Sequence, residues 1–168
     1  MKLIMSILRM LVCSPIFIAG ALTAILFRLF KKKPKYGSES RVKLVESVAK
    51  MLEMQRTVSG NKPIVNSAGR PNRKAMGYIY GFVDAALDSI GQDISDISIG
   101  MPTVFGVFCY LYPGKELEYT DYLLDHVGKD ETVMTGVASG GQQYTDLISG
   151  RKSSPMQFGL FLLNGDEY

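Results

Sequence analysis

The longest apolar stretch of the chain lies near its N-terminus. Residues 10–27 carry no charged side chain, and 14 of these 18 residues are apolar. A helix of this length spans roughly 27 Å at about 1.5 Å per residue, close to the hydrocarbon thickness of a bilayer, about 30 Å. The pattern therefore predicts a single transmembrane helix, and we expect residues 1–35 to form a membrane anchor with its basic flank.

Two other interpretations of this segment stay open. A cleaved signal peptide needs small residues before the cleavage point, and Ala21 or Ala24 would serve. The mature chain would then begin with a strongly basic stretch, which disfavours cleavage. A soluble core or interfacial helix of the same length is hard to accommodate in so small a domain.

Basic residues gather on the C-terminal side of the apolar run. The N-terminal side offers only Lys2 and Arg9, whereas the other side has a cluster of five cations: Arg28, Lys31, Lys32, Lys33 and Lys35. Because basic flanks stay on the cytoplasmic side, we expect a single-pass membrane protein whose C-terminal domain is cytoplasmic, or in the equivalent compartment of an organelle. The cluster also predicts contact with anionic membrane lipid.

Helical periodicity resumes after the basic flank. Apolar residues over 41–57 recur at i, i+3 and i+4 spacing, which predicts an amphipathic juxtamembrane helix within residues 36–58. Its expected inward face consists of Leu44, Val45, Val48, Met51 and Leu52. Residues 59–72 are dense in turn formers and predict a loop.

Residues 73–168 have the pattern of a compact helical domain. Asn72 is a typical N-cap for a helix over 73–90, and Gly91 is a typical end for it. The next uncharged run, 97–114, is interrupted by proline and glycine. We therefore expect a central core helix there, over residues 101–112, and not a second membrane span.

Two further helices and a short terminal element complete this domain. The pattern predicts a helix over 116–127, with Leu117, Leu123, Leu124 and Val127 facing inward, and another over 131–148. The segment 155–163 predicts a terminal strand or a short buried helix. The expected fold class is thus mainly α, with one N-terminal transmembrane helix followed by a small domain of about four to five helices.

Two pairs of glycines interrupt the predicted helices at a spacing of four residues. Gly77 and Gly81 lie in the helix over 73–90, and Gly136 and Gly140 lie in the helix over 131–148. Glycine costs about 1 kcal/mol relative to alanine inside a helix. We expect these positions either to allow close helix packing or, near Ser139 to Gly141, to break the second helix.

The net charge of +3 is the sum of opposite regional charges. Residues 1–35 contain seven cations and no acid, which gives +7. Residues 36–74 contain eight cations and three acids (+5), whereas residues 84–131 contain two cations and ten acids (−8). The overall basicity therefore does not indicate nucleic-acid binding. The acidic part is expected to face away from the bilayer or toward a basic partner.

Paired aspartates are the sharpest candidates for chemistry. Asp84 with Asp88, and Asp121 with Asp125, are each four residues apart on one helix face. Two such pairs could together hold a hard divalent metal such as Mg²⁺. Solvated acidic faces of this kind are common, so we expect no metal, no other cofactor and no catalytic residue.

The remaining nucleophiles and ligands lack a recognisable motif. His126 is the only histidine and precedes a predicted helix end, where a surface role is expected. The glycine before Ser139 is three positions away, so the pattern differs from a nucleophile elbow. Cys13 and Cys109 both lie in apolar runs, expected in the membrane and in the core, which predicts no disulfide.

These features favour a structural function over a catalytic one. We expect a membrane-anchored, non-catalytic accessory or assembly subunit of a larger membrane protein complex, of a secretion, conjugation or bioenergetic type. Its expected partners are membrane lipid and other protein subunits. An exported small helical binding or immunity-type protein is one alternative, and a membrane-tethered Mg²⁺-dependent enzyme that uses the paired aspartates is another.

Overall fold

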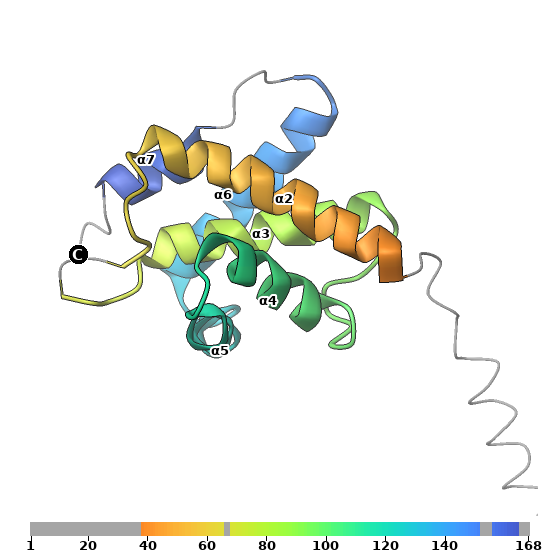
Figure 1. Cartoon of the computed structure of the whole chain (residues 1–168), viewed down its shortest axis with the longest axis horizontal. Coiled ribbons are helices and arrows are strands. Elements are labelled where there is room, and N and C mark those ends of the chain that lie inside the picture. Colours follow the sequence, from red (N-terminus) through yellow and green to blue (C-terminus); the bar gives the residue numbers. More distant parts are fainter. Residues whose placement is uncertain (1–37, 66–67, 152–155, 165–168) are drawn as a thin grey trace, which may run out of the picture. The chain divides into compact units, whose positions relative to one another are not determined.

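The computed structural model describes residues 38–65, 68–151 and 156–164, which all fall within one compact unit, Tyr36–Tyr168. This described part of the chain is mainly helical and contains no strand, which confirms the expected class for these residues (Figure 1). Its helices are α2 (Ser38–Val58), α3 (Arg73–Ser89), α4 (Gly100–Leu111), α5 (Glu116–His126), α6 (Glu131–Ile148) and α7 (Gln157–Asn164).

Among the described helices, none is both long enough and apolar enough to cross a bilayer. The transmembrane helix expected over residues 10–27, the basic flank from Arg28 to Lys35, and Cys13 all lie outside the described residues.

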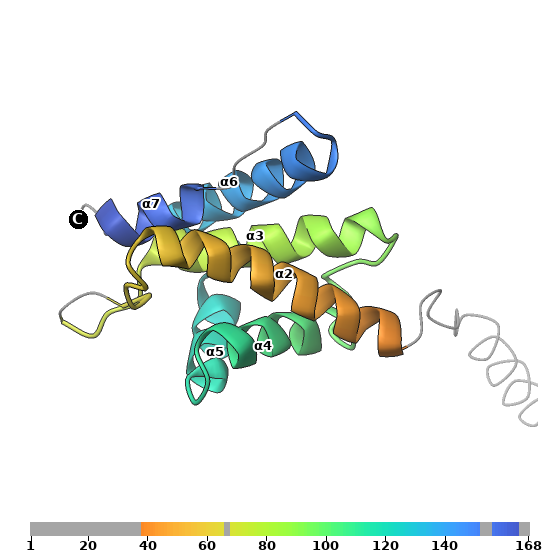
Figure 2. The ribbon, with the colours of Figure 1, turned by 45° about the horizontal axis from the view of Figure 1, so that its top comes forward.

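The centre of the fold is α3, which contacts α2, α4, α5, α6 and α7. In both views α4 and α5 lie on one side of α3, and α6 lies on the other (Figures 1 and 2). Nearly every apolar side chain of α3 is buried, including Tyr78, Ile79, Phe82 and Val83. The expectation that the helix at 101–112 is the central one is therefore wrong, because α4 has a solvent-exposed side.

The pairing of α3 with α6 is the most extensive helix contact in the described residues. A methyl group added to Gly77 would collide with the backbone carbonyl of Val133, and one added to Gly81 would collide with the carbonyl of Val137. Both partners advance by four residues, so the two helices run in the same direction.

The glycines of α6 make the reciprocal contacts. A methyl group at Gly136 would collide with the carbonyl of Lys74, and one at Gly140 would collide with the carbonyl of Tyr78. The structure thus brings both glycine pairs into one contact, in which the backbones approach each other directly. Since α6 continues unbroken past Ser139, these glycines permit close packing and do not end the helix.

Side-chain caps fix the starts of these two helices. Asn72 Oδ1 accepts a hydrogen bond of 2.9 Å from the Ala75 N–H, and its Nδ2 donates to the Phe161 carbonyl in α7 at 2.8 Å. Asp130 Oδ1 accepts from the Thr132 N–H at 2.8 Å. Each cap satisfies amides that the helix itself leaves without acceptors.

The amphipathic face expected for the 41–57 helix is confirmed in α2. Val48 and Leu52 are fully buried, while Leu44, Val45 and Met51 are partly buried against the core. This face packs on α4, α7 and α3, so α2 belongs to the same packed body as the helices that follow it.

The orientation of α5 differs from the sequence expectation. Leu123 is buried and Val127 is partly buried, as expected, but Leu117 and Leu124 are exposed. The inward positions are taken by Tyr119 and Thr120 instead. Tyr119 packs edge-on against Phe108 at 5.6 Å between ring centroids, and such aromatic pairs stabilise a fold by about 0.5–1.5 kcal/mol beyond the area that they bury.

The terminal segment is helical and not a strand. α7 buries Phe158 and Leu162. The Phe158 ring stacks on Tyr78 with 5.7 Å between centroids, and Phe161 meets the same ring edge-on. α7 is thereby attached to the central helix through an aromatic cluster.

Candidate functional site

The most unusual surface of the described residues belongs to α4. This helix has no charged residue, although only one side of it is buried. On the exposed side, Phe105 and Tyr110 keep 36% and 49% of their surface in contact with solvent, and Cys109 is also exposed. A helix that is apolar all round is usually covered on all sides, so the outer side of α4 lacks the cover that its composition predicts.

A groove runs between α4, α5 and the loop that precedes α4, with a volume of about 210 Å³. We call it the α4–α5 groove; the apolar residues that line it include Tyr80, Ile97, Met101, Val104, Leu123 and Leu124. The loop approaches the start of α4 so closely that a methyl group added to Gly100 would collide with the carbonyl of Ile94.

Exposed leucines and isoleucine extend the apolar surface around the groove. Ile97 is 74% exposed and Leu124 is 47% exposed at its edge. Leu117 is 65% exposed and lies seven residues before Leu124, on the same stripe of α5. Phe105 follows the groove residue Met101 by four residues, which places it on the same stripe of α4.

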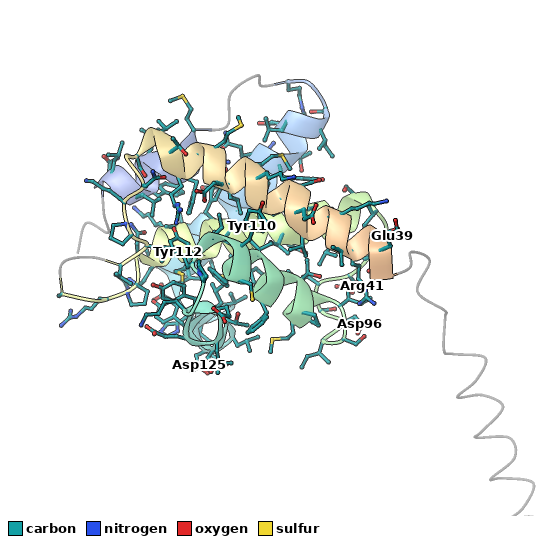
Figure 3. The ribbon with its side chains drawn as sticks, in the orientation of Figure 1. Glu39, Arg41, Asp96, Tyr110, Tyr112 and Asp125 are labelled. Atoms are coloured by element: carbon teal, nitrogen blue, oxygen red, sulfur yellow. The ribbon has the colours of Figure 1, made fainter. Side chains whose placement is uncertain are left out.

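Acidic residues border this apolar surface. Residues 93–125 contain six acids and one lysine, a net charge of −5. Asp121 and Asp125 are exposed on α5, and Asp96 is exposed in the loop before α4. Figure 3 shows Asp96 beside the start of α4 and Asp125 on α5. The one lysine, Lys115, is paired with Glu118 at 2.7 Å.

Hydrogen bonds order the acidic loop. Asp93 Oδ1 accepts from the Ser95 N–H at 2.8 Å, and hydrogen bonds from Ser95 hold the pKa of the Asp93 carboxyl below its usual value. Asp96 Oδ1 accepts from the Ser98 N–H at 3.0 Å. The guanidinium of Arg41 donates to the Ser98 carbonyl at 3.4 Å, which ties the loop to α2.

A second, polar groove of about 790 Å³ lies between the C-terminal halves of α3 and α6. Asp84, Asp88 and Asp93 line it, together with Gln142 and other small or polar residues. Burial, followed by repulsion from Asp88 and Asp93, raises the pKa of the Asp84 carboxyl above its usual value.

The structure does not bring the two aspartate pairs into one metal site. Asp84 and Asp88 line the α3–α6 groove, whereas Asp121 and Asp125 are exposed on α5. In the part of the chain that the structure describes, no three histidine, cysteine, aspartate or glutamate side chains are grouped so that they could hold a metal ion.

The other candidates from the sequence occupy ordinary helical positions. His126 Nδ1 lies 2.8 Å from the Tyr122 carbonyl, and its ring stacks on the Tyr122 ring at 4.0 Å. Ser139 donates its hydroxyl hydrogen to the Thr135 carbonyl at 2.9 Å. Cys109 is exposed, so its expected place in the core is wrong.

Comparisons of the chain with protein-family models, with curated proteins and with solved structures found no match.

The α4–α5 groove was not among the candidates that the sequence pattern indicated. The sequence feature that could have indicated this groove is the uncharged helix α4, which lies between two acidic segments. A helix without any charged side chain gives little indication of which side is buried, so Phe105 could not be told apart from the buried Phe108 by pattern alone.

Proposed function

We propose that this chain is a membrane-anchored, non-catalytic accessory or assembly subunit of a larger membrane protein complex. In this proposal residues 1–35 hold the chain in the membrane, with the helical body on the cytoplasmic side or its organellar equivalent. The helical body binds another subunit of the complex. The binding surface consists of the α4–α5 groove and the exposed apolar side chains around it.

The exposed apolar side of α4 is the observation that carries this proposal. Contiguous apolar surfaces on folded proteins are usually covered by a partner, especially where polar residues surround them. Here Ile97 and Leu124 are exposed at the groove, and Phe105 and Leu117 are exposed on the stripes of α4 and α5 that contain the groove residues Met101 and Leu124. Exposed acidic side chains lie on α5 and in the loop before α4. This combination is typical of protein interfaces, in which an apolar centre is surrounded by a polar rim.

Purification of the full chain from its native membrane in a mild detergent tests the proposal. We expect the wild-type chain to co-purify with other membrane proteins in fixed proportion, and Leu124→Glu to lose them while keeping its circular dichroism spectrum. Met54→Glu is the matched control, because Met54 is 66% exposed on α2 and lies outside the groove. A wild-type chain that emerges alone and monomeric would contradict the proposal.

A further inference from the structure

We propose that the occupant of the α4–α5 groove is an amphipathic helix of the partner subunit, with lysine or arginine residues beside its apolar stripe. This inference rests on the proposed function, since it assigns the chemistry of the partner at the same surface.

The shape of the groove favours a helix. Two neighbouring helices, α4 and α5, form two of its walls and the loop before α4 forms a third, and the described residues offer no sheet edge that an extended peptide could join. Its volume of about 210 Å³ is below the range of about 300–1,000 Å³ that is typical of small-molecule pockets. A groove of this size suits one or two apolar side chains that project from a docked helix.

The length of the surface sets the length of the partner segment. α4 has 12 residues, which corresponds to about 18 Å at about 1.5 Å per residue. A partner helix of roughly three turns therefore covers the face from Met101 to the end of α4, and its anchors are apolar residues at i, i+3 or i+4, and i+7.

The charge of the border favours a basic helix. Asp121 lies four residues after Leu117 and three before Leu124, so acidic and apolar side chains share one stripe of α5. Asp93 lines the α3–α6 groove and Glu118 is paired with Lys115, whereas Asp125 and Asp96 add negative charge nearby. A partner with lysine or arginine within one turn of its apolar anchors pairs with these carboxylates, which also accelerates association.

The same charges disfavour a lipid surface as the occupant. Anionic headgroups attract basic segments and repel carboxylates, so the acidic border opposes docking of this face on an anionic bilayer. An acidic helix is disfavoured in the same way, because like charges would be brought together.

A synthetic 18-residue helical peptide tests this assignment. It carries leucines at i, i+3, i+4 and i+7 spacing with lysines on both flanks, and a second peptide replaces every lysine with glutamate. Binding to the full chain in phosphatidylcholine nanodiscs is measured by fluorescence anisotropy at low salt, and binding to protein-free nanodiscs is subtracted.

We expect the lysine peptide to bind and the glutamate peptide to bind at least about tenfold more weakly. Leu124→Glu is expected to weaken binding of the lysine peptide by about tenfold or more, because an apolar contact is lost and a charge is buried. The double variant Asp121→Asn and Asp125→Asn is expected to weaken it about threefold or more, an effect that high salt removes. Met54→Glu is the control that leaves binding unchanged.

Three results would overturn the inference. They are equal binding of the two peptides, equal binding to the wild-type chain and Leu124→Glu, and binding to protein-free nanodiscs that accounts for the whole signal. If co-purification of other subunits persists while the lysine peptide fails, the chemistry assigned to the partner is wrong and the proposed function stands. If the chain purifies alone, the proposed function itself fails.

Discussion

The side chain of Gln55 in α2 accepts a hydrogen bond of 3.0 Å from the backbone N–H of Phe158, 103 residues later in the chain. The same Oε1 atom accepts a hydrogen bond of 3.1 Å from the Tyr78 hydroxyl in α3. Phe158 lies in the first turn of α7, where amides have no acceptor within their own helix. Gln55 therefore caps α7 from a different helix, and it does so in the fully buried interior.

This relationship predicts that Gln55→Met loosens α7. Methionine keeps most of the volume but removes the acceptor, so the buried Phe158 N–H loses its partner at a cost of about 1–3 kcal/mol. Hydrogen exchange is expected to accelerate at the amides of α7, and the melting temperature to fall. Lys50→Met, at an exposed position of the same helix, is the control. Unchanged protection of the Phe158 amide would contradict the capping role.

The contact between α3 and α6 makes opposite predictions for two glycines that are close in space. Gly81→Ala places a methyl group against the carbonyl of Val137, and a backbone atom cannot turn aside as a side chain can. The added strain is expected to lower the free energy of unfolding by about 3 kcal/mol, the upper part of the range for overpacked cores. Thermal unfolding of the two purified proteins measures the difference.

Gly141→Ala is the matched control on the other helix. Its nearest neighbour would be the Gly81 carbonyl at 3.4 Å, an ordinary van der Waals contact. Alanine then adds helix propensity of up to about 1 kcal/mol, so this variant is expected to equal or exceed the wild-type melting temperature. Equal destabilisation by both substitutions would show that close packing does not explain the glycines of this contact.

The sequence predicts the bounds of the capped helices well. The expected helix at 131–148 has the same bounds as α6, and the expected helix at 73–90 agrees with α3 to one residue. Asn72 starts α3 as expected, and Gly91 follows α3 with a φ of +68°, a conformation that favours glycine. The Asp130 cap of α6 is seen only in the structure. Helix caps and breakers depend on residues that are close together in the sequence, so the sequence pattern alone can identify them.

The inward faces of α4 and α5 could not be predicted in the same way. In α5 two stripes compete, one with Leu117 and Leu124 and the other with Tyr119 and Leu123, and a count of leucines favours the first, which the structure leaves exposed. The packing of Tyr119 on Phe108 decides between them, and that contact joins two different helices. Hydropathy does not identify the centre of the fold either, because α3 is central through contacts with five other helices, among them the close approach to α6 at Gly77 and Gly81.

The raised pKa of Asp84 predicts a pH-dependent effect of Asp84→Asn. The folded state binds the proton more tightly than the unfolded state, whose carboxyl titrates near 3.8, because burial and the charges of Asp88 and Asp93 oppose ionisation. The ionised carboxylate thus lowers stability as pH rises above that value. Asp84→Asn is expected to melt at a higher temperature than the wild type at pH 7, and the difference should vanish at a pH below 3.8.

A second neutral substitution controls for the loss of one negative charge. Asp125→Asn removes the same charge from α5, outside the α3–α6 groove that Asp84 lines. We expect it to change the melting temperature less than Asp84→Asn does at neutral pH. A higher melting temperature of Asp84→Asn at acidic pH but not at pH 7 would contradict the expected direction of the pH dependence.

The exposed position of Cys109 predicts that this thiol reacts in the folded protein. The chain contains two cysteines, so Cys13→Ser leaves Cys109 as the only thiol. Partial desolvation by neighbouring groups, with a contribution from the charge of Glu116, raises the pKa of the Cys109 thiol, which lowers the thiolate fraction at pH 7. A maleimide is therefore expected to label Cys109 completely without denaturant, but more slowly than it labels free cysteine. Labelling that requires unfolding would show that Cys109 is buried in the folded protein, and it would contradict the exposure of this side of α4.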